Sequence, residues 1–266
     1  MLVFPQLSTG VVTEYPITKR AIARSVVNAL AGGSTDVFSD PDGAASAWEL
    51  QAVGLTAAEW GAIEALFAAA SGMWQTFTFL DPVGNLLANS EDLAAGAWTN
   101  GALIELTPGV GDPLGTTRAT RVINAGAAVE SVAQTLDVPG NFTYCVSTWA
   151  RTIGTSAVTL AIGTLTKTFA LTGSWARISL SGNLGTPATS VTFGAQLGVG
   201  ASVDLFGMQV EAQPAASDYQ MTGSHGGVYS KARFSSDRFT VTAQGTDSFD
   251  VKLGIVSTEG QVADDD

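Results

Sequence analysis

The sequence predicts an all-β protein with one amphipathic helix, in which one β domain is interrupted by an inserted β-sandwich. Three observations lead to this prediction. Short apolar-polar alternations run through most of the chain, one strongly capped helix stands among them, and a Thr/Ser/Gly-rich middle differs in texture from both flanks. A chain of 266 residues is long enough for two cores. We therefore expect residues 1–84 and 223–266 to form one discontinuous domain around an insert at 85–222.

The outer domain is expected to consist of strands that bury one face and expose the other. Apolar side chains alternate along four stretches that flank the helix. Such alternation is typical of antiparallel strands with one wet face. It predicts strands at 48–52, 76–79, 239–241 and 249–255.

The helix is expected at residues 56–71. Thr56 and Glu59 have the spacing of a capping box, in which each side chain satisfies a free amide of the first turn. Gly72 stands where a left-handed C-terminal cap belongs. Between them, apolar residues recur at spacings of three and four, and they predict the core face of this helix: Trp60, Ile63 and Phe67.

The insert reads as a series of short strands separated by turn residues. Seven or eight strands at such spacing are typical of a β-sandwich. Sequences such as Pro139-Gly140-Asn141 supply the turns. The predicted strands are 118–124, 129–137, 142–151, 157–162, 165–171, 175–181, 189–198 and 201–211.

Composition excludes several classes of function. A net charge of -12 argues against a protein that grips nucleic-acid phosphates. One cysteine and one histidine cannot build a disulfide or a usual zinc site, so neither a metal nor another cofactor is expected. His225 lies in a Gly-rich connection that suits a hinge better than a catalytic triad, and Cys145 is expected to be a small buried side chain. The chain lacks a run of ~18 apolar residues, so membrane insertion is not expected.

Aromatic residues of the insert are the candidates for ligand binding, because a tryptophan face can stack on a sugar ring. Along strand 142–151, Trp149 and Arg151 share one side, opposite Tyr144 and Val146. If Tyr144 and Val146 face the core, Trp149 and Arg151 can meet a ligand. In the alternative, Trp149 fills the sandwich and Arg151 lies at its rim. The glycan-binding candidates are Trp98, Trp149, Arg151 and Trp175.

Catalysis is not expected. Glycoside hydrolysis needs two facing carboxylates, and the sequence does not place any two of the insert's acids opposite one another. Those acids are Glu105, Glu130, Asp204 and Glu211. Glycine-rich phosphate-binding loops do not occur in the sequence either.

The outer segments resemble the first domain of distal tail and related minor tail proteins of long-tailed bacteriophages. The resemblance covers about 125 residues and depends on short motifs in a fixed order around the helix. These are Ala47-Trp48-Glu49-Leu50, Gly54-Leu55-Thr56-Ala57-Ala58-Glu59-Trp60, Leu66-Phe67, Phe77-Thr78-Phe79-Leu80-Asp81-Pro82, Tyr229, Ala232-Arg233-Phe234, Asp237 and the strand 249–255.

The insert resembles the jelly-roll, carbohydrate-binding-like modules of phage tails and fibres. Its most specific stretch runs from Phe206 to Thr222, and it has Val210 where a leucine is common. That module family has no fixed set of sugar ligands. The motif residues are Asn85-Leu86-Leu87, Ser90-Glu91-Asp92, Trp98, Gln134, the strand from Tyr144 to Arg151, Trp175-Ala176-Arg177, Phe206-Gly207-Met208-Gln209-Val210-Glu211, Ser217-Asp218-Tyr219 and Thr222.

The resemblance implies a structural virion protein that is made in the host cytoplasm and is found at the phage tail tip or baseplate. Copies would form a six-membered ring that joins the tail tube protein to the hub and receptor-binding proteins. The insert would face outward, decorate the tail and bind host carbohydrate weakly. DNA would pass an acidic lumen without adhering. A receptor-binding lectin and a glycan-degrading enzyme remain as alternatives.

Overall fold

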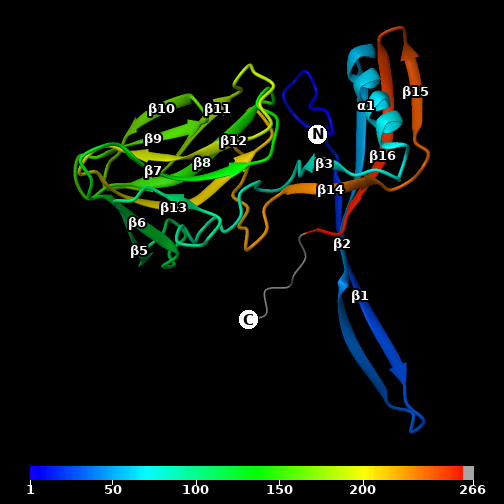
Figure 1. Cartoon of the computed structure of the whole chain (residues 1–266), viewed down its shortest axis with the longest axis horizontal. Helices are drawn as coiled ribbons and strands as arrows, with labels where there is room; N and C mark the ends of the chain where they lie inside the picture. The colour runs from blue at the N-terminus through cyan, green and yellow to red at the C-terminus, as the bar shows by residue number, and fades with distance from the viewer. Residues whose placement is uncertain (260–266) are drawn as a thin grey trace. The chain divides into compact units, whose positions relative to one another are not determined.

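The computed structural model describes residues 1–259, with the side chains of all of them except residues 41 and 42. Within this range the fold is all-β with one helix, as the sequence predicts (Figure 1). The chain divides into two compact units. The first comprises residues 1–80 and the segment that begins at Tyr229, and the second comprises Asp81–Val228. These boundaries lie close to 84/85 and 222/223, where the sequence places them.

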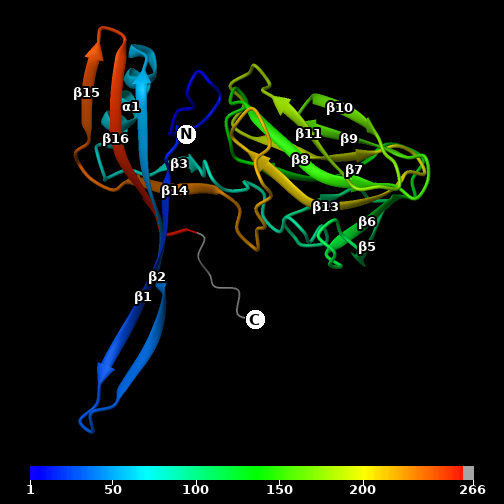
Figure 2. The same cartoon turned by 180° about the vertical axis from the view of Figure 1, so that it is seen from behind.

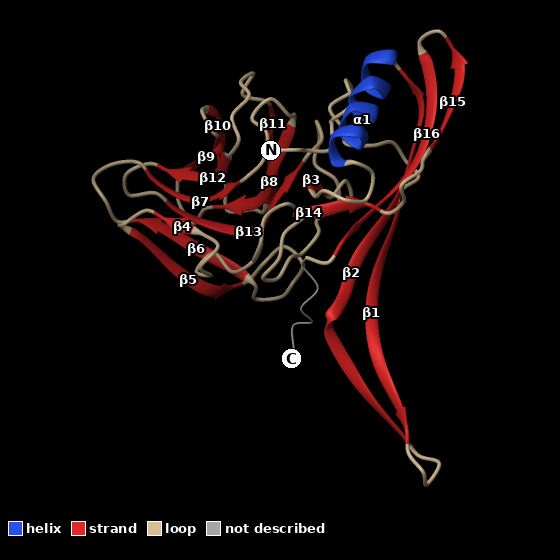
Figure 3. Ribbon diagram, turned by 45° about the vertical axis from the view of Figure 1, so that its right-hand side comes forward, coloured by secondary structure: helices blue, strands red, loops and turns tan. Residues whose placement is uncertain are grey.

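The first unit is a six-stranded sheet with helix α1 (Ala57–Ala70) lying against β2 and β16 (Figure 3). The strand order is β1-β2-β16-β14-β3, and β15 pairs with β16. Strands far apart in sequence therefore share one sheet. The strands are β1 (Thr18–Ala29), β2 (Thr35–Leu55), β3 (Phe77–Leu80), β14 (Val228–Phe234), β15 (Thr240–Gly245) and β16 (Ser248–Ser257).

The helix is confirmed, and its caps have the predicted chemistry. Thr56 and Glu59 form the complete capping box. The Glu59 carboxylate also accepts hydrogen bonds from the amide and the hydroxyl of Ser8, at 2.8 and 2.7 Å, which ties the N-terminal segment to the helix. The left-handed cap begins one residue earlier than predicted, because Ser71 has φ 52° and Gly72 follows with φ 65°.

The core of the first unit forms between α1 and the sheet. Ile63 is buried against Leu55 and Val251. Trp60 and Phe67 are partly buried and both contact Phe239, with ring centroids 5.3 and 4.6 Å apart, respectively. The helix is therefore attached by the three side chains that its spacing singles out: Trp60, Ile63 and Phe67.

The strands predicted at 48–52, 76–79 and 249–255 lie in β2, β3 and β16. The prediction of a half-buried strand at 239–241 is wrong, because every residue of β15 is exposed. Phe239 precedes β15, and its ring packs on the helix instead. The sequence predicts neither β1 nor the N-terminal half of β2.

The second unit is a β-sandwich of two five-stranded antiparallel sheets (Figure 2). The rings of Tyr144 and Phe193, one from each sheet, meet at 5.1 Å in its core. All eight predicted strands are present, and β4 and β5 are additional. One sheet has the order β10 (Leu165–Ala170), β9 (Ala157–Ile162), β12 (Val191–Leu197), β7 (Glu130–Leu136), β4 (Thr99–Asn100). The other has the order β11 (Ala176–Gly182), β8 (Tyr144–Arg151), β13 (Ser202–Glu211), β6 (Ala119–Asn124), β5 (Ile104–Val110).

Buried polar side chains fasten the two ends of the sandwich unit to each other. The Asn85 amide nitrogen donates to the carbonyl of Met208 at 2.8 Å, and its oxygen accepts from the amides of Leu87 and Val210 at 3.1 and 2.9 Å. The Gln209 side chain acts in the same way: its amide nitrogen donates to the carbonyl of Asp218, and its oxygen accepts from the amide of Gln220. We call this network the clamp, and its remaining members are Ser90, Tyr219 and Thr222.

The clamp gives a structural meaning to the most specific motif of the insert. Ser90 and Tyr219 hydroxyls lie 2.8 Å apart, and the Thr222 hydroxyl donates to the carbonyl of Leu87 at 2.8 Å. These polar residues are needed where the chain enters and leaves the sandwich, because buried backbone groups there have no strand partner. The motif therefore stabilises the module.

Candidate functional sites: a two-stranded ribbon and a tryptophan-arginine platform

The first candidate site is the outer part of the β1-β2 hairpin, residues 24–29 paired with 35–40, which we call the ribbon. Strand β16 pairs with β2 only as far as Ser46, so among the described residues no third strand supports the ribbon. In Figure 1 it extends away from the rest of its own unit. Every residue of β1 is exposed. Isolated two-stranded hairpins are at best marginally stable in water.

The two faces of the ribbon differ in chemistry. Paired residues of neighbouring strands share a face, so the register assigns each side chain to one of the two. One face has no charge and consists of the pairs Ser25-Ser39, Val27-Val37 and Ala29-Thr35. The other carries Arg24-Asp40, Val26-Phe38 and Asn28-Asp36. Val37 and Phe38, which are adjacent and point to opposite faces, are 63% and 54% exposed. Apolar groups on both faces, with an open edge along β1, are features of a surface that binds another chain.

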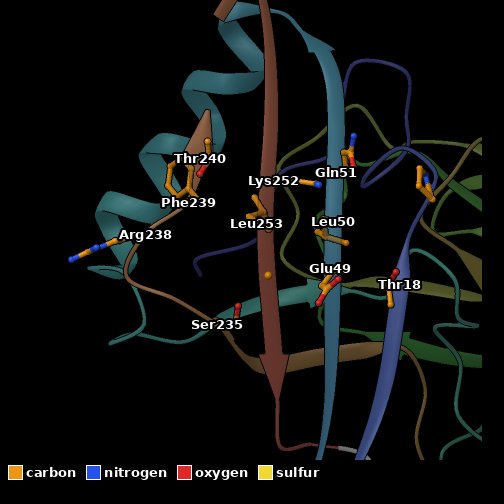
Figure 4. Close-up of a pocket in the computed structure, with 12 residues that line it drawn as sticks. Thr18, Glu49, Leu50, Gln51, Ser235, Arg238, Phe239, Thr240, Lys252 and Leu253 are labelled. Atoms are coloured by element: carbon orange, nitrogen blue, oxygen red, sulfur yellow. The ribbon is translucent and has the colours of Figure 1, made fainter. Parts of the chain in front are cut away.

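An open groove of about 490 Å³ lies beside β2 and β16 in the body of the first unit (Figure 4). Its charged lining residues are Glu49, Arg238 and Lys252, and Leu50 and Phe239 are apolar lining residues. On the hairpin it reaches Thr18, which pairs with Glu49, whereas the ribbon begins at the Arg24-Asp40 pair. The groove is therefore a surface separate from the ribbon.

The second candidate site lies on the outer face of the sandwich, where β8 meets the edge strand β11. Tyr144 and Val146 are fully buried, so Trp149 and Arg151 lie on the opposite, outer side of β8. Arg177 on β11 is paired with Trp149 across the strands.

Trp175, directly before β11, lies under the Arg151 guanidinium, whose carbon is 4.7 Å from the ring centroid. Each tryptophan thus faces an arginine of the neighbouring strand. We call these four partly exposed residues the platform: Trp149, Arg151, Trp175 and Arg177.

A buried ion-pair network fixes one end of the platform. The Asp204 side chain is 1% exposed, and both of its oxygens accept hydrogen bonds from guanidinium groups. Arg121 donates at 2.8 and 3.2 Å, and Arg151 donates from Nε at 2.9 Å. Because Arg151 is also bonded to the carbonyl of Gly111 at 3.3 Å, its guanidinium is held in place over the Trp175 ring. Such a fixed cation-π pair keeps the indole plane oriented for stacking.

The other arginine of the platform is not neutralised. Among the described residues, Arg177 makes no ion pair with a carboxylate, and its Nη2 donates only to the Ser147 hydroxyl, at 3.2 Å. A hollow of about 430 Å³ opens beside Arg151, lined also by Thr152, Ile153 and Gly173. The platform thus combines two indole faces, a free guanidinium and an adjoining hollow, which is the equipment for binding a polar ring-shaped ligand.

Trp98, the remaining glycan-binding candidate, does not belong to the platform. It directly precedes β4, a strand of the opposite sheet, and is only 6% exposed. Its indole Nε1 donates to the carbonyl of Asn89 at 3.0 Å. The Trp98 side chain therefore has a structural role close to the clamp, and the structure corrects its assignment as a binding residue.

The structure places the lone histidine and the lone cysteine in different environments. His225 is exposed in its connection. Cys145 is buried, and this burial, with the nearby Glu211 carboxylate, raises the pKa of its thiol to about 11. Within residues 1–259, His, Cys, Asp and Glu side chains form no group of three that could hold a metal ion. No helix in that part of the chain is long and apolar enough to cross a membrane.

Two features of the candidate sites are not predicted by the sequence. The ribbon has no alternating pattern, and Arg177 belongs to a motif whose letters do not show that it faces Trp149. The register of two predicted strands, 142–151 and 175–181, would have paired Arg177 with Trp149, but sequence alone does not fix register.

Comparisons with known proteins complete the description. No family model matches this sequence, and no curated protein matches it. Three solved structures show a partial likeness. The CBM22-1 xylan-binding domain from Paenibacillus barcinonensis Xyn10C has a TM-score of 0.39 at 10% identity, covering 50% of this chain and 94% of that one. A xylan-binding domain from CBM 22 has a TM-score of 0.39 at 16% identity, covering 52% and 100%. The enzymatically active domain of bacteriophage CBA120 tailspike protein 4 has a TM-score of 0.38 at 13% identity; the likeness covers 50% of this chain and 22% of the tailspike chain.

Proposed function

We propose that this protein is a structural subunit that assembles with copies of itself through the β1-β2 ribbon. The ribbon is the observation that carries the proposal. It exposes Val26, Val27, Val37 and Phe38 around an unpaired edge, and it lacks a core of its own. Burial of such side chains contributes about 1.5–3 kcal/mol each when complete. A neighbouring ribbon would supply that burial and a strand partner at once.

A second copy of this chain suits the ribbon better than an unrelated partner. Its uncharged face, centred on the Val27-Val37 pair, opposes no like charges when two copies meet. An interface in which every copy offers the edge of β1 and accepts it elsewhere is heterologous, and such interfaces form rings when the rotation from copy to copy closes. The groove beside β2 and β16, lined by Glu49, Arg238 and Lys252, offers a polar receiving surface.

More specifically, we propose that six copies assemble into a ring at the distal end of a bacteriophage tail tube. The ring would join the tube protein to the hub and receptor-binding proteins, in a virion assembled in the host cytoplasm. The support is the sequence resemblance, whose motif residues build the core of the first unit: the Trp48 ring contacts the rings of Phe79 and Tyr229 there. We place the charged face of the ribbon toward the lumen: Asp40 is ion-paired with Arg24, so Asp36 is the carboxylate that would keep passing DNA from adhering.

Native mass spectrometry and negative-stain images of the full chain test this proposal. We expect a closed ring for the wild type and dispersed subunits for Val37→Asp. Val199→Asp is a matched control, because Val199 is also 63% exposed but lies in a turn of the sandwich unit. A wild type that stays monomeric at micromolar concentration, or a Val37→Asp variant that still forms the ring, would refute assembly through the ribbon.

A second candidate function is saccharide binding by the sandwich unit, which would make the protein a lectin-like receptor-binding protein. The platform favours it, because Trp149 and Trp175 present ring faces beside guanidinium donors. We expect glycan-array binding that Trp149→Ala abolishes and Trp98→Ala does not abolish in protein that remains folded. Array binding that survives Trp149→Ala would exclude the platform.

We propose that the protein is not an enzyme. Asp204 is held by Arg121 and Arg151, and the Glu211 carboxylate accepts from the amide and hydroxyl of Ser217. Neither acid is placed to donate a proton to a glycosidic oxygen. Release of reducing sugar from host envelope, abolished by substitution of a single Asp or Glu, would overturn this part of the proposal.

A further inference from the structure

The polar groups of the platform are mostly hydrogen-bond donors. Arg177 has a guanidinium without a carboxylate partner among the described residues, and Arg151 contributes a second positive charge. Two carboxylates lie on the same face of the sheet. Both oxygens of Asp204 accept hydrogen bonds from arginines. The Glu211 carboxylate accepts a hydrogen bond from the amide of Ser217. The remaining polar neighbours, Ser147 and Ser179, are hydroxyls.

This imbalance determines which ligand fits. A neutral sugar presents hydroxyls that both donate and accept, and proteins usually meet them with carboxylates or amides as well as donors. The platform has no free carboxylate to accept from such hydroxyls. A ligand whose groups only accept, such as a carboxylate, satisfies a guanidinium by paired charge-assisted hydrogen bonds.

The geometry supports one mode of binding. Trp149 and Arg177 are opposite each other on neighbouring strands, and Trp175 with Arg151 forms the next such pair along the same edge. A saccharide stacked on the indole of Trp149 would therefore bring a carboxylate on its ring within reach of Arg177. The hollow beside Arg151 leaves room for a further ring.

We propose that the platform binds an acidic saccharide, one whose sugar rings carry carboxylate groups, with Arg177 as the residue that recognises the carboxylate. The inference rests on saccharide binding, the second candidate function above, and adds its chemical class. It is independent of ring assembly through the ribbon. It also accounts for a cluster of arginines on a chain whose net charge is -12.

Two matched pairs of probes test the inference by isothermal titration with the full chain: oligogalacturonate against its methyl ester, and sialyllactose against lactose. We expect at least one acidic member to bind about tenfold more tightly than its neutral partner, the contribution of one charge-assisted pair. Arg177→Gln should remove the preference, and Arg177→Lys should restore part of it. Lys167→Gln, which removes the same charge from an exposed position on the opposite sheet, should leave it unchanged.

The outcomes separate the inference from the function on which it rests. Equal affinity for acidic and neutral members would refute the acidic preference and leave saccharide binding intact. Absence of binding to all four probes would refute both. Binding of single-stranded DNA that depends on Trp149 and Arg177, without binding of either acidic probe, would assign the platform to nucleic acid instead. A preference that persists in Arg177→Gln protein with an unchanged unfolding midpoint would refute the role of Arg177.

Discussion

Asn85→Ala is expected to destabilise the sandwich unit more than any other single change of a polar side chain in the clamp. Asn85 is 1% exposed and makes four hydrogen bonds, to the carbonyls of Met208 and Gln220 and from the amides of Leu87 and Val210. Alanine leaves the two amides without this partner. A buried unpaired group costs about 1–3 kcal/mol. Since water can enter part of the space, we expect a loss of about 3 kcal/mol of unfolding free energy.

Hydrogen exchange followed by mass spectrometry measures this loss where it occurs. In the variant, amides of residues 206–222 should exchange faster, while those of α1 in the first unit keep their protection. Asn183→Ala is the control, because Asn183 is exposed and its side chain accepts one hydrogen bond, from Gly185, in a turn. If Asn85→Ala and Asn183→Ala lower protection by the same amount, the clamp does not fasten the ends of the unit and our reasoning fails.

Two further predictions follow from the environments of single side chains. Burial acts to raise the pKa of Glu59, but hydrogen bonds from Ser8 and Thr56 outweigh it and lower the pKa to about 2. The first unit should therefore lose stability as pH falls from roughly 4.5 toward 2. In acid unfolding curves, the Glu59→Gln variant should lose less stability than the wild type over that interval. Parallel curves for the two proteins would contradict this prediction. Cys145, with a pKa of about 11, should not react with a disulfide reagent at about pH 8 until the protein is unfolded, and stoichiometric labelling of the native protein would show otherwise.

Much of the fold could be predicted because several elements carry apolar residues at a regular period. In β8, Tyr144 and Val146 lie on the core side, and Trp149 and Arg151 lie on the other side and are partly exposed, although Cys145 and Ser147 on that side are buried as well. The helix could be predicted equally well, because Thr56 and Glu59 mark its start and an apolar stripe follows. Elements of this kind record their environment in the sequence.

The ribbon could not be predicted, because its apolar residues occur in adjacent positions. Val26 with Val27, and Val37 with Phe38, place apolar groups on both faces, so neither a period of two nor one of 3.6 appears. Such a pattern is not explained by the folding of a single chain. Under the proposed assembly, the pattern records contacts with another copy of the chain, which a single sequence does not identify.

The platform was predicted in part. The sequence states that Trp149 and Arg151 lie on one side of their strand, and the burial of Tyr144 settles that this side is the outer one. Trp98 could not be told apart from Trp175, because composition does not say where an indole points. In the structure, the 6% exposure of Trp98 and the hydrogen bond from its indole to the carbonyl of Asn89 assign this side chain to the interior.

Strand β2 runs without interruption from Thr35 to Leu55, so the ribbon and the body of the first unit share one backbone. Its inner part, from Ser46 to Leu55, is paired along its length with β16. Tension applied at the tip would therefore travel along a nearly inextensible strand and load those hydrogen bonds in shear, all together, rather than peel them apart in turn. The same continuity makes the hairpin a lever, so that a tilt of its tip would twist the sheet on which α1 rests.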